Sequence, residues 1–200
     1  MLLRLATLIL AAISTFAADP ATVPALQSPP IEGLKAKDLF DSFDQTRGSS
    51  KHEAIDIMHP RGTPVHAVVD GVITKLFLSK PGGNTIYLFD NAGVFCYYYA
   101  HLDGYAPKLA EGQHVSRGDV IGYVGSTGNA NAIAPHLHFT IFALGPEKHW
   151  YHGTPINPYP FLLQTLRQNF WPLIQKNLSF FGLEEESLLH QHNLQYTAFL

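Results

Sequence analysis

Hydrophobic and polar positions alternate in short runs between residues 38 and 160, and glycines separate these runs. The runs are VHAVVDGVITKLFL, NTIYLF, VFCYYYA, VIGYVG and HLHFTIF. Closely spaced runs that are rich in β-branched and aromatic residues, with glycine turns between them, are typical of consecutive strands rather than of alternating strands and helices. The pattern therefore predicts a mainly β fold, built as an antiparallel β-sheet or sandwich.

The hydrophobic period changes after Pro160. Apolar residues then recur at three- and four-residue spacing, as at Leu162 and Leu166, until Pro172 interrupts them. This spacing is typical of an amphipathic helix, which proline breaks. We expect residues 161–200 to form a helical C-terminal extension whose apolar stripe docks on the β domain, in preference to binding a partner or touching a membrane surface.

The N-terminus predicts export. Arg4 precedes an apolar run over residues 5–13, and two alanines follow at positions 17 and 18. This arrangement is typical of a cleavable signal peptide, and the run is too short for a helix that crosses a bilayer. We therefore predict a signal peptide over residues 1–17 and an exported protein, periplasmic in a Gram-negative-type cell or extracellular. No later apolar run reaches about 18 residues, so the sequence predicts no transmembrane anchor.

The segment after the signal peptide is rich in proline. Residues 18–37 contain four prolines and show no hydrophobic period. That composition predicts an extended linker. Residues 38–160 then remain as one β domain between the linker and the C-terminal extension.

Charge and cysteine content narrow the range of functions. The 200 residues include 13 basic and 16 acidic ones, and the formal net charge is −3. A chain without a basic excess is a poor candidate for a nucleic-acid-binding protein. Cys96 is the single cysteine of the sequence, so no intramolecular disulfide forms within it, and we expect the thiol to be a small buried hydrophobe. Stability then depends on packing or on a bound metal.

Two histidines lie on the polar face of the last strand. Side chains alternate across a strand, so in HLHFTIF His136 and His138 share one face while Leu137 and Phe139 share the other. The apolar face belongs to the core. The two imidazole rings therefore point away from the core.

A second segment, HEAID, offers an imidazole and a carboxylate. In an extended chain His52 and Asp56 lie on one side, and the small Ala54 between them leaves room for both. His59 is a weaker candidate ligand, because its odd offset from Asp56 points it to the other side of a strand.

In the third segment, FCYYYAH, alternation puts His101 on the face of Tyr97 and Tyr99. These two tyrosines either pack within the sheet or line a substrate groove. A chain with 11 histidines in 200 positions contains about 0.6 HxH pairs by chance, so such pairs do not establish a metal site by themselves.

The flanking residues carry a family resemblance. The segments that carry it are, in chain order, DSFDQTRGSSKHEAIDI, RGTPVHAVVDGVI, YYAHL, EGQHVSRGDVIGYVGSTGNA, PHLHF and INPYP. Together they resemble the lysostaphin/LytM-type zinc metallopeptidases, which cut the peptides of peptidoglycan. The resemblance covers about residues 38–160 and implies the LytM fold with its duplicated hybrid motif. It also implies five site residues, the zinc ligands His52, Asp56 and His138 and the catalytic His101 and His136. Ala54 stands where the family usually has glycine.

This set of residues suits hydrolysis. Two imidazoles and one carboxylate suit a single Zn²⁺ ion, and three protein ligands leave a fourth position open for water. Spacing alone does not decide which of His136 and His138 binds the metal; only the resemblance selects His138. Zinc lowers the pKa of bound water to about 7 and polarises a scissile carbonyl. His136 is then placed to act as general base, and His101 either shares that role or, when protonated, stabilises the oxyanion.

The sequence therefore predicts an exported zinc metalloendopeptidase that hydrolyses peptide cross-links of peptidoglycan by zinc-activated water, with the peptide stems as its binding partners. The resemblance implies a Gram-negative-type D-alanyl endopeptidase more than a glycyl-glycine one. The alternative is a non-enzymatic LytM-fold protein that binds the wall or activates an amidase, and such a protein needs no open coordination site. A cytoplasmic phosphocarrier with paired histidines is disfavoured by the predicted signal peptide. The sequence identifies no regulatory protein partner.

Overall fold

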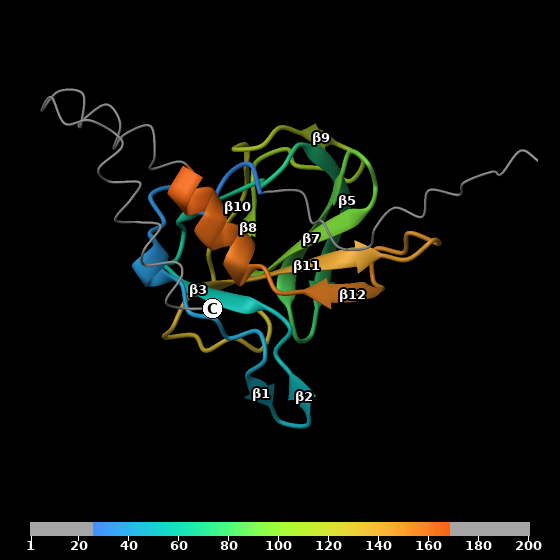
Figure 1. The fold of residues 1–200 in the computed structure, drawn as a ribbon. Helices are drawn as coiled ribbons and strands as arrows, with labels where there is room; N and C mark the ends of the chain where they lie inside the picture. The colour runs from blue at the N-terminus through green and yellow to red at the C-terminus, as the bar shows by residue number, and fades with distance from the viewer. Residues whose placement is uncertain (1–25, 169–200) are drawn as a thin grey trace, which may run out of the picture.

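The structure is a computed structural model that describes residues 26–168 (Figure 1). The predicted signal peptide, the first part of the predicted linker and most of the predicted C-terminal extension lie outside the described residues. The described chain is mainly β and its sheets are antiparallel, which confirms the predicted fold class. Among the described residues, no helix is long and apolar enough to cross a membrane.

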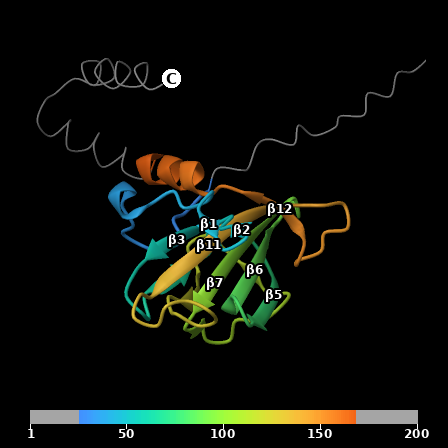
Figure 2. The same ribbon diagram turned by 90° about the horizontal axis from the view of Figure 1, so that it is seen from below.

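The largest sheet has seven strands. Its order is β12 (Gly153–Ile156), β11 (His136–Leu144), β7 (Phe95–Leu102), β6 (Gly83–Asp90), β5 (Gly71–Ser79) and β9 (His114–Val115), and β3 (Ile55–Met58) pairs with β11. The first half of β11 pairs with β3 and the second half with β12, while β7 lies along its other edge. Figure 2 shows β3, β11, β7, β6 and β5 side by side.

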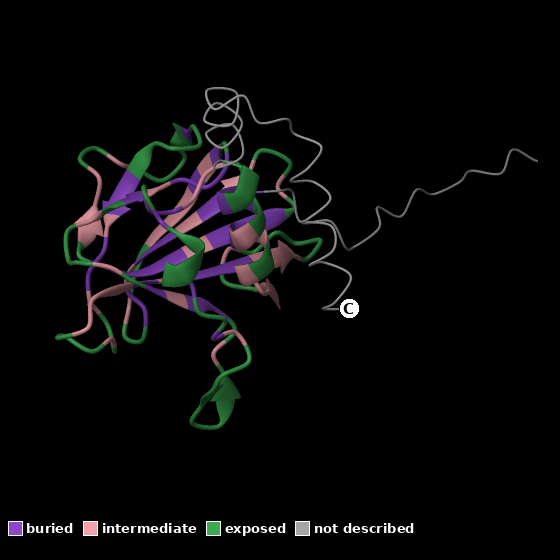
Figure 3. Ribbon diagram, turned by 60° about the vertical axis from the view of Figure 1, so that its left-hand side comes forward, coloured by how far each residue is buried: buried purple, intermediate pink, exposed green. Residues whose placement is uncertain are grey.

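Smaller elements complete the domain. A three-stranded sheet has the order β4 (Pro64–His66), β10 (Val120–Tyr123) and β8 (Gly104–Tyr105). A separate hairpin consists of β1 (Thr46–Arg47) and β2 (Ser50–Lys51), and a single 3-10 turn, η1, spans Ala36–Asp38. The hairpin is exposed and projects from the sheets, whereas buried positions follow the strands of the large sheet (Figure 3).

The core contains side chains from both larger sheets. Phe139 of β11 and Tyr97 and Tyr99 of β7 are fully buried in one cluster with Val65 of β4 and Ile121 of β10. These inward residues alternate with outward ones because successive side chains of a strand point to opposite faces. Burying each large apolar side chain stabilises the fold by about 1.5–3 kcal/mol, so the apolar set fixes which face of β11 and β7 turns outward.

The segment before the first strand belongs to the folded unit. Leu26, Ile31 and Leu34 lie within the predicted linker, yet all three are buried in the core cluster. The Gln27 amide donates to the Val68 carbonyl at 3.0 Å and ties this segment to the domain. Apolar burial therefore overrides the extended tendency that the prolines indicated from Leu26 onward.

A helix follows the last strand of the large sheet and covers the same part of the core. Residues 159–168 are helical, and Leu162 and Leu166 are buried in the core cluster. The hydroxyl of Thr165 donates to the Leu26 carbonyl at 2.7 Å. The two ends of the described chain thus pack against each other, and the helix lies outside the large sheet, away from β5 and β6 (Figure 2).

Candidate metal centre and active-site cleft

β11 presents two of the predicted site residues. His136 and His138 line a cleft on the outer face of the large sheet, while Leu137 and Phe139 are fully buried. The alternation predicted from HLHFTIF is therefore confirmed. The strand register places His138 directly opposite Asp56 of β3, so the side chains of both strands meet on this outer face.

His52 reaches the same place from a bend rather than from a strand. The chain turns at Glu53, whose φ of 55° lies in the left-handed region, and β3 begins only afterwards. The Glu53 amide donates to the Phe43 carbonyl at 2.8 Å and holds this bend. The prediction of one continuous extended segment from His52 to Asp56 is thus wrong, although the bend does bring the two side chains together.

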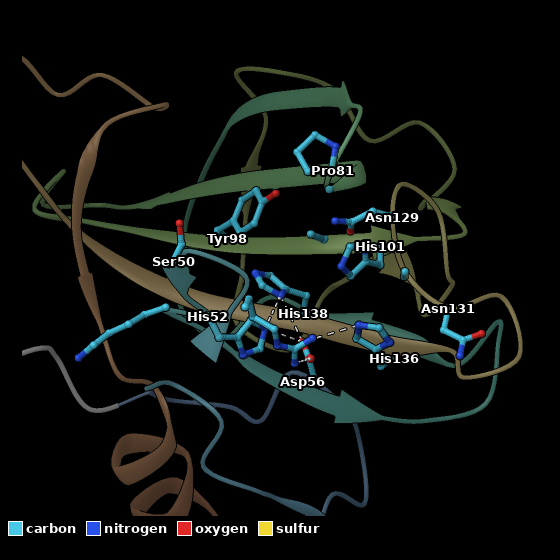
Figure 4. Close-up of a pocket in the computed structure, with 15 residues that line it drawn as sticks. Ser50, His52, Asp56, Pro81, Tyr98, His101, Asn129, Asn131, His136 and His138 are labelled. Atoms are coloured by element: carbon cyan, nitrogen blue, oxygen red, sulfur yellow. Dashed lines mark hydrogen bonds and ion pairs between the residues drawn. The ribbon is translucent and has the colours of Figure 1, made fainter. Parts of the chain in front are cut away.

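Three ligand atoms converge on one point. His52 Nε2 lies 3.1 Å from both Asp56 Oδ1 and His138 Nδ1, and the latter two atoms lie 3.2 Å apart. Among the described residues, these three side chains form the group that could hold a metal ion. They come from the bend before β3, from β3 and from β11 (Figure 4).

Contacts behind this triangle determine which atoms face its centre. His52 Nδ1 lies 3.1 Å from the Ser42 carbonyl oxygen, so in the neutral ring Nδ1 carries the hydrogen and Nε2 presents its lone pair. Arg47 Nη2 donates to Asp56 Oδ2 at 2.8 Å, which leaves Oδ1 to face the centre. His138 turns Nδ1 to the same point. With a lone pair on each of these three atoms, separations this short are favourable only when a cation or a shared proton lies between them.

The geometry fits zinc. Ligand atoms held at about 2.0–2.1 Å from a tetrahedral zinc ion lie about 3.3–3.4 Å from one another. The separations of 3.1 to 3.2 Å in this chain are close to that value. Two imidazole nitrogens and one carboxylate oxygen are also a donor set that zinc accepts, and three protein ligands leave a fourth position for water or substrate.

The charge states of the ligands also suit a metal. Burial lowers the pKa of His138 and favours its neutral ring. In the metal-free chain burial acts to raise the pKa of Asp56, but hydrogen bonds donated by ring N–H groups of His138 and His52 outweigh it and hold that pKa well below its usual range. Neutral imidazole and ionised carboxylate are the forms that coordinate metal ions.

His136 lies beside the triangle without belonging to it. Its Nε2 is 3.7 Å from Asp56 Oδ1, farther than the three ligand atoms are from one another. Its Nδ1 lies 2.9 Å from the Ala134 carbonyl oxygen. In a neutral ring the hydrogen therefore resides on Nδ1, and Nε2 is available as a proton acceptor near the metal site.

His101 has the same kind of anchor. Its Nδ1 lies 2.9 Å from the Thr127 carbonyl oxygen, and its ring centroid lies 4.9 Å from that of His136 and 5.4 Å from that of His138. The residue is only 7% exposed, and burial lowers its pKa to about 4. His101 is therefore neutral at pH 7.

The face of β7 that His101 occupies differs from the prediction. Alternation put His101 with Tyr97 and Tyr99, but these tyrosines are fully buried, and Tyr98 lines the cleft with His101. Between Tyr99 and Leu102 the pairing of β7 with β6 shifts register, and His101 has a φ of 60°. This bulge turns the end of the strand, so the prediction of a shared face is wrong. The reading of Tyr97 and Tyr99 as sheet packing is confirmed.

The five predicted residues line one cleft of about 730 Å³ (Figure 4). Its walls are the β1–β2 hairpin, the turn at Pro81 and Gly82, and residues 129–131 of the loop before β11. The two loops approach closely at Gly83, where an added Cβ would lie 2.1 Å from Thr127 Oγ1. That approach also places the Thr127 carbonyl against the His101 ring.

The weaker candidates lie elsewhere. His59 Nδ1 contacts Thr63 Oγ1 at 3.3 Å, and His59 does not belong to the metal-binding group. Cys96 is buried, as predicted, and burial raises the pKa of its thiol, which makes it a poor nucleophile.

Sequence reasoning missed several residues of the site. Arg47 lies within a segment that carries the family resemblance, but nothing local indicates that its guanidinium reaches Asp56. The carbonyls of Ser42 and Thr127 orient His52 and His101, and carbonyl contacts have no signature in residue type.

Residues 50–158 match the family model of peptidase family M23. The chain is 38% identical over 112 residues to the glycyl-glycine endopeptidase ALE-1 of Staphylococcus capitis, covering 56% of this chain and 29% of that protein. It is 34% identical over 120 residues to an L-Ala–D-Glu endopeptidase of Bacillus subtilis, covering 58% and 35%. It is 40% identical over 116 residues to the DD-carboxypeptidase/endopeptidase Mpg of Neisseria meningitidis serogroup B, covering 57% and 23%. The matches thus span about a quarter to a third of these relatives.

Solved structures show the same fold. The antimicrobial peptidase lysostaphin from Staphylococcus simulans superposes with a TM-score of 0.58 at 30% identity, covering 72% of this chain and 55% of that one. Its catalytic domain superposes with a TM-score of 0.50 at 36% identity, covering 57% and 81%.

Proposed function

Because the chain belongs to peptidase family M23, we propose that it is an exported zinc metalloendopeptidase that hydrolyses peptide cross-links of peptidoglycan. The observation that carries the proposal is the convergence of His52, Asp56 and His138 beside two further histidine rings in one cleft. Relatives named as glycyl-glycine, L-Ala–D-Glu and DD endopeptidases support a peptide bond as the target. Export, to the periplasm or the cell exterior, rests on the predicted signal peptide.

The metal ligands are His52 Nε2, Asp56 Oδ1 and His138 Nδ1. A zinc ion held by them supplies Lewis-acid chemistry, because it lowers the pKa of water and polarises a carbonyl group. Arg47 holds the second oxygen of Asp56 at 2.8 Å and so favours a carboxylate that offers one oxygen to the ion. Such a contact orients the ligand.

His136 is the general base in this proposal. Its Nδ1 is committed to the Ala134 carbonyl, so its neutral ring offers Nε2 to a water molecule next to the scissile peptide bond. Nε2 lies 3.7 Å from Asp56 Oδ1, close enough to the metal site to take the proton that the attacking water releases.

His101 acts with His136 as a second proton carrier. Its lowered pKa makes it neutral before the reaction, so it begins as an acceptor and not as a cation. Once it has accepted a proton, the imidazolium stabilises the developing oxyanion and can pass the proton to the leaving amine. This proposed order combines the two roles that the sequence left open for His101.

Sacculi provide the test of this function. The purified protein, loaded with zinc, is incubated with sacculi, with and without a chelator, and the soluble muropeptides are analysed by mass spectrometry. We expect cross-linked dimers to fall to monomers only in the sample without chelator, and His136→Ala to leave the dimers intact. Dimers that persist equally with and without chelator would favour the non-enzymatic alternative, a wall-binding or amidase-activating protein.

A further inference from the structure

The outer face of the large sheet continues beyond the metal site as an aromatic surface. Residues directly opposite one another on neighbouring strands share a face. Thr140 of β11 pairs with Tyr98 of β7, and Tyr98 pairs with Tyr87 of β6. Because Thr140 follows His138 by two residues, these tyrosines lie on the same face as the metal ligands.

The loop between β11 and β12 adds further rings to this surface. The ring centroid of Trp150 lies 4.8 Å from that of Tyr87 and 5.3 Å from that of Tyr151. With Tyr98 and Phe142, these rings line a pocket of about 280 Å³. Tyr98 also lines the catalytic cleft, so the aromatic pocket adjoins it.

We propose that this aromatic pocket binds a pyranose ring of the peptidoglycan glycan strand, while the stem peptide bonded to that strand occupies the catalytic cleft. The inference rests on the proposed function, which supplies the polymer that carries both sugar and peptide.

The chemistry of the pocket suits a neutral sugar. A pyranose ring presents C–H groups with a slight positive charge, and these groups pack favourably on the negative faces of aromatic rings. Tyr151 is 65% exposed, so its ring is accessible to such a ligand. The Lys75 ammonium group beside the pocket is paired, because it lies 5.9 Å over the Trp150 ring and bridges to Glu111 at 2.9 Å. Because Glu111 already compensates the charge of Lys75, this pair offers no free charge to a strongly charged ligand.

Size and distance agree with the same ligand. Ligand pockets for whole small molecules measure about 300–1,000 Å³, so a pocket of 280 Å³ suits a single ring better than a protein helix. Steps of 5.9, 4.7 and 4.8 Å join the ring centroids of His138, Tyr98, Tyr87 and Trp150 in turn. Trp150 is thus at most about 15 Å from His138, and an extended peptide of four residues spans about 13–14 Å.

Binding is tested without any need for hydrolysis. The chain has two tryptophans, so Trp171→Phe leaves Trp150 as the only reporter of fluorescence. Titration with N-acetylchitohexaose is expected to change this fluorescence to saturation. Tyr151→Ala is expected to weaken the affinity about five- to tenfold, the loss typical of one aromatic contact. Phe40→Ala is the matched control, because Phe40 is 69% exposed and lines neither the catalytic cleft nor the aromatic pocket.

Three results would overturn the inference. One is an absence of saturable fluorescence change up to millimolar sugar, and another is equal affinity of the Tyr151→Ala and Phe40→Ala proteins. Saturation by an apolar peptide but not by the sugar would equally reject it and indicate a protein partner.

A kinetic comparison separates this inference from the proposed function. Tyr151→Ala is expected to raise KM for cross-linked muropeptides that retain their sugars about five- to tenfold, and to leave KM for the sugar-free peptide dimer unchanged. A protein that binds the sugar but cleaves neither substrate would refute the proposed function alone. A variant that cleaves both substrates with wild-type KM would refute the aromatic pocket alone.

Discussion

Replacing His101 by glutamine tests whether burial keeps this ring neutral. Burial lowers the pKa of His101 from its ordinary 6.5 to about 4, and the neighbouring His138 and His136 act in the same direction. The Thr127 carbonyl, which accepts from Nδ1, opposes them only in part. A pKa difference of this size between the folded and unfolded chain corresponds to about 3 kcal/mol of unfolding free energy.

The direction in which pH changes the free energy of unfolding depends on whether the folded or the unfolded chain binds the proton first. Above pH 6.5 His101 is neutral in both states, and its contribution to stability is fully present. As the pH falls from 6.5 towards 4, the unfolded chain is protonated before the folded one, so the free energy of unfolding falls. Below pH 4 both states carry the proton and the loss is complete. The window lies above the range in which Asp56, with its lowered pKa, becomes protonated.

Urea unfolding of the metal-free protein, in chelator, measures this effect. Between pH 7 and pH 4 the wild-type protein is expected to lose about 3 kcal/mol more stability than His101→Gln does. His114→Gln, at an exposed position of β9, is the control and is expected to follow the wild type. Parallel losses in the wild type and His101→Gln, within about 0.5 kcal/mol, would refute the claim that burial holds His101 neutral.

Three other substitutions test individual contacts in the site and in the core. Arg47→Ala is expected to weaken zinc binding about 10–100-fold in competition with a chromophoric chelator, because Asp56 loses its 2.8 Å partner, and unchanged affinity would contradict that role. Tyr97→Phe is expected to leave the free energy of unfolding in urea unchanged or to raise it by about 1 kcal/mol, because among the described residues its buried hydroxyl has no hydrogen-bond partner. A fall in that free energy of more than about 1 kcal/mol would contradict this. Gly125→Ala is expected to cost about 1–3 kcal/mol, because its Cβ would lie 2.3 Å from the Asp103 amide nitrogen, and a wild-type melting temperature would show that the loop can yield.

Regular strands made part of the site predictable. β11 runs for nine residues without a bulge, so simple alternation correctly separated His136 and His138 from the buried Leu137 and Phe139. The mainly β fold was predictable for the same reason, because the apolar residues of each strand alternate with polar ones and so mark the face that is buried. The choice of His138 over His136 as ligand came only from the family resemblance.

The other site residues lie on irregular backbone, and this is why their positions could not be predicted from the sequence. His101 turns to the cleft through a bulge whose position depends on how β6 pairs with β7, a contact between distant parts of the chain. His52 approaches Asp56 through the bend at Glu53, and no glycine or proline in this segment indicates a bend. Arg47 contacts Asp56 across nine residues from a separate hairpin. Local patterns carry no information on such tertiary contacts.

Bound zinc per chain, measured by elemental analysis in the wild type and in five single-alanine variants, distinguishes the three metal ligands from the two proton-transfer histidines. About one zinc ion is expected in the wild type, in His101→Ala and in His136→Ala. Little or none is expected in the variants of the three ligands, His52→Ala, Asp56→Ala and His138→Ala. Full zinc content in a ligand variant, or loss of zinc from His101→Ala or His136→Ala, would contradict the division between metal ligands and proton-transfer residues.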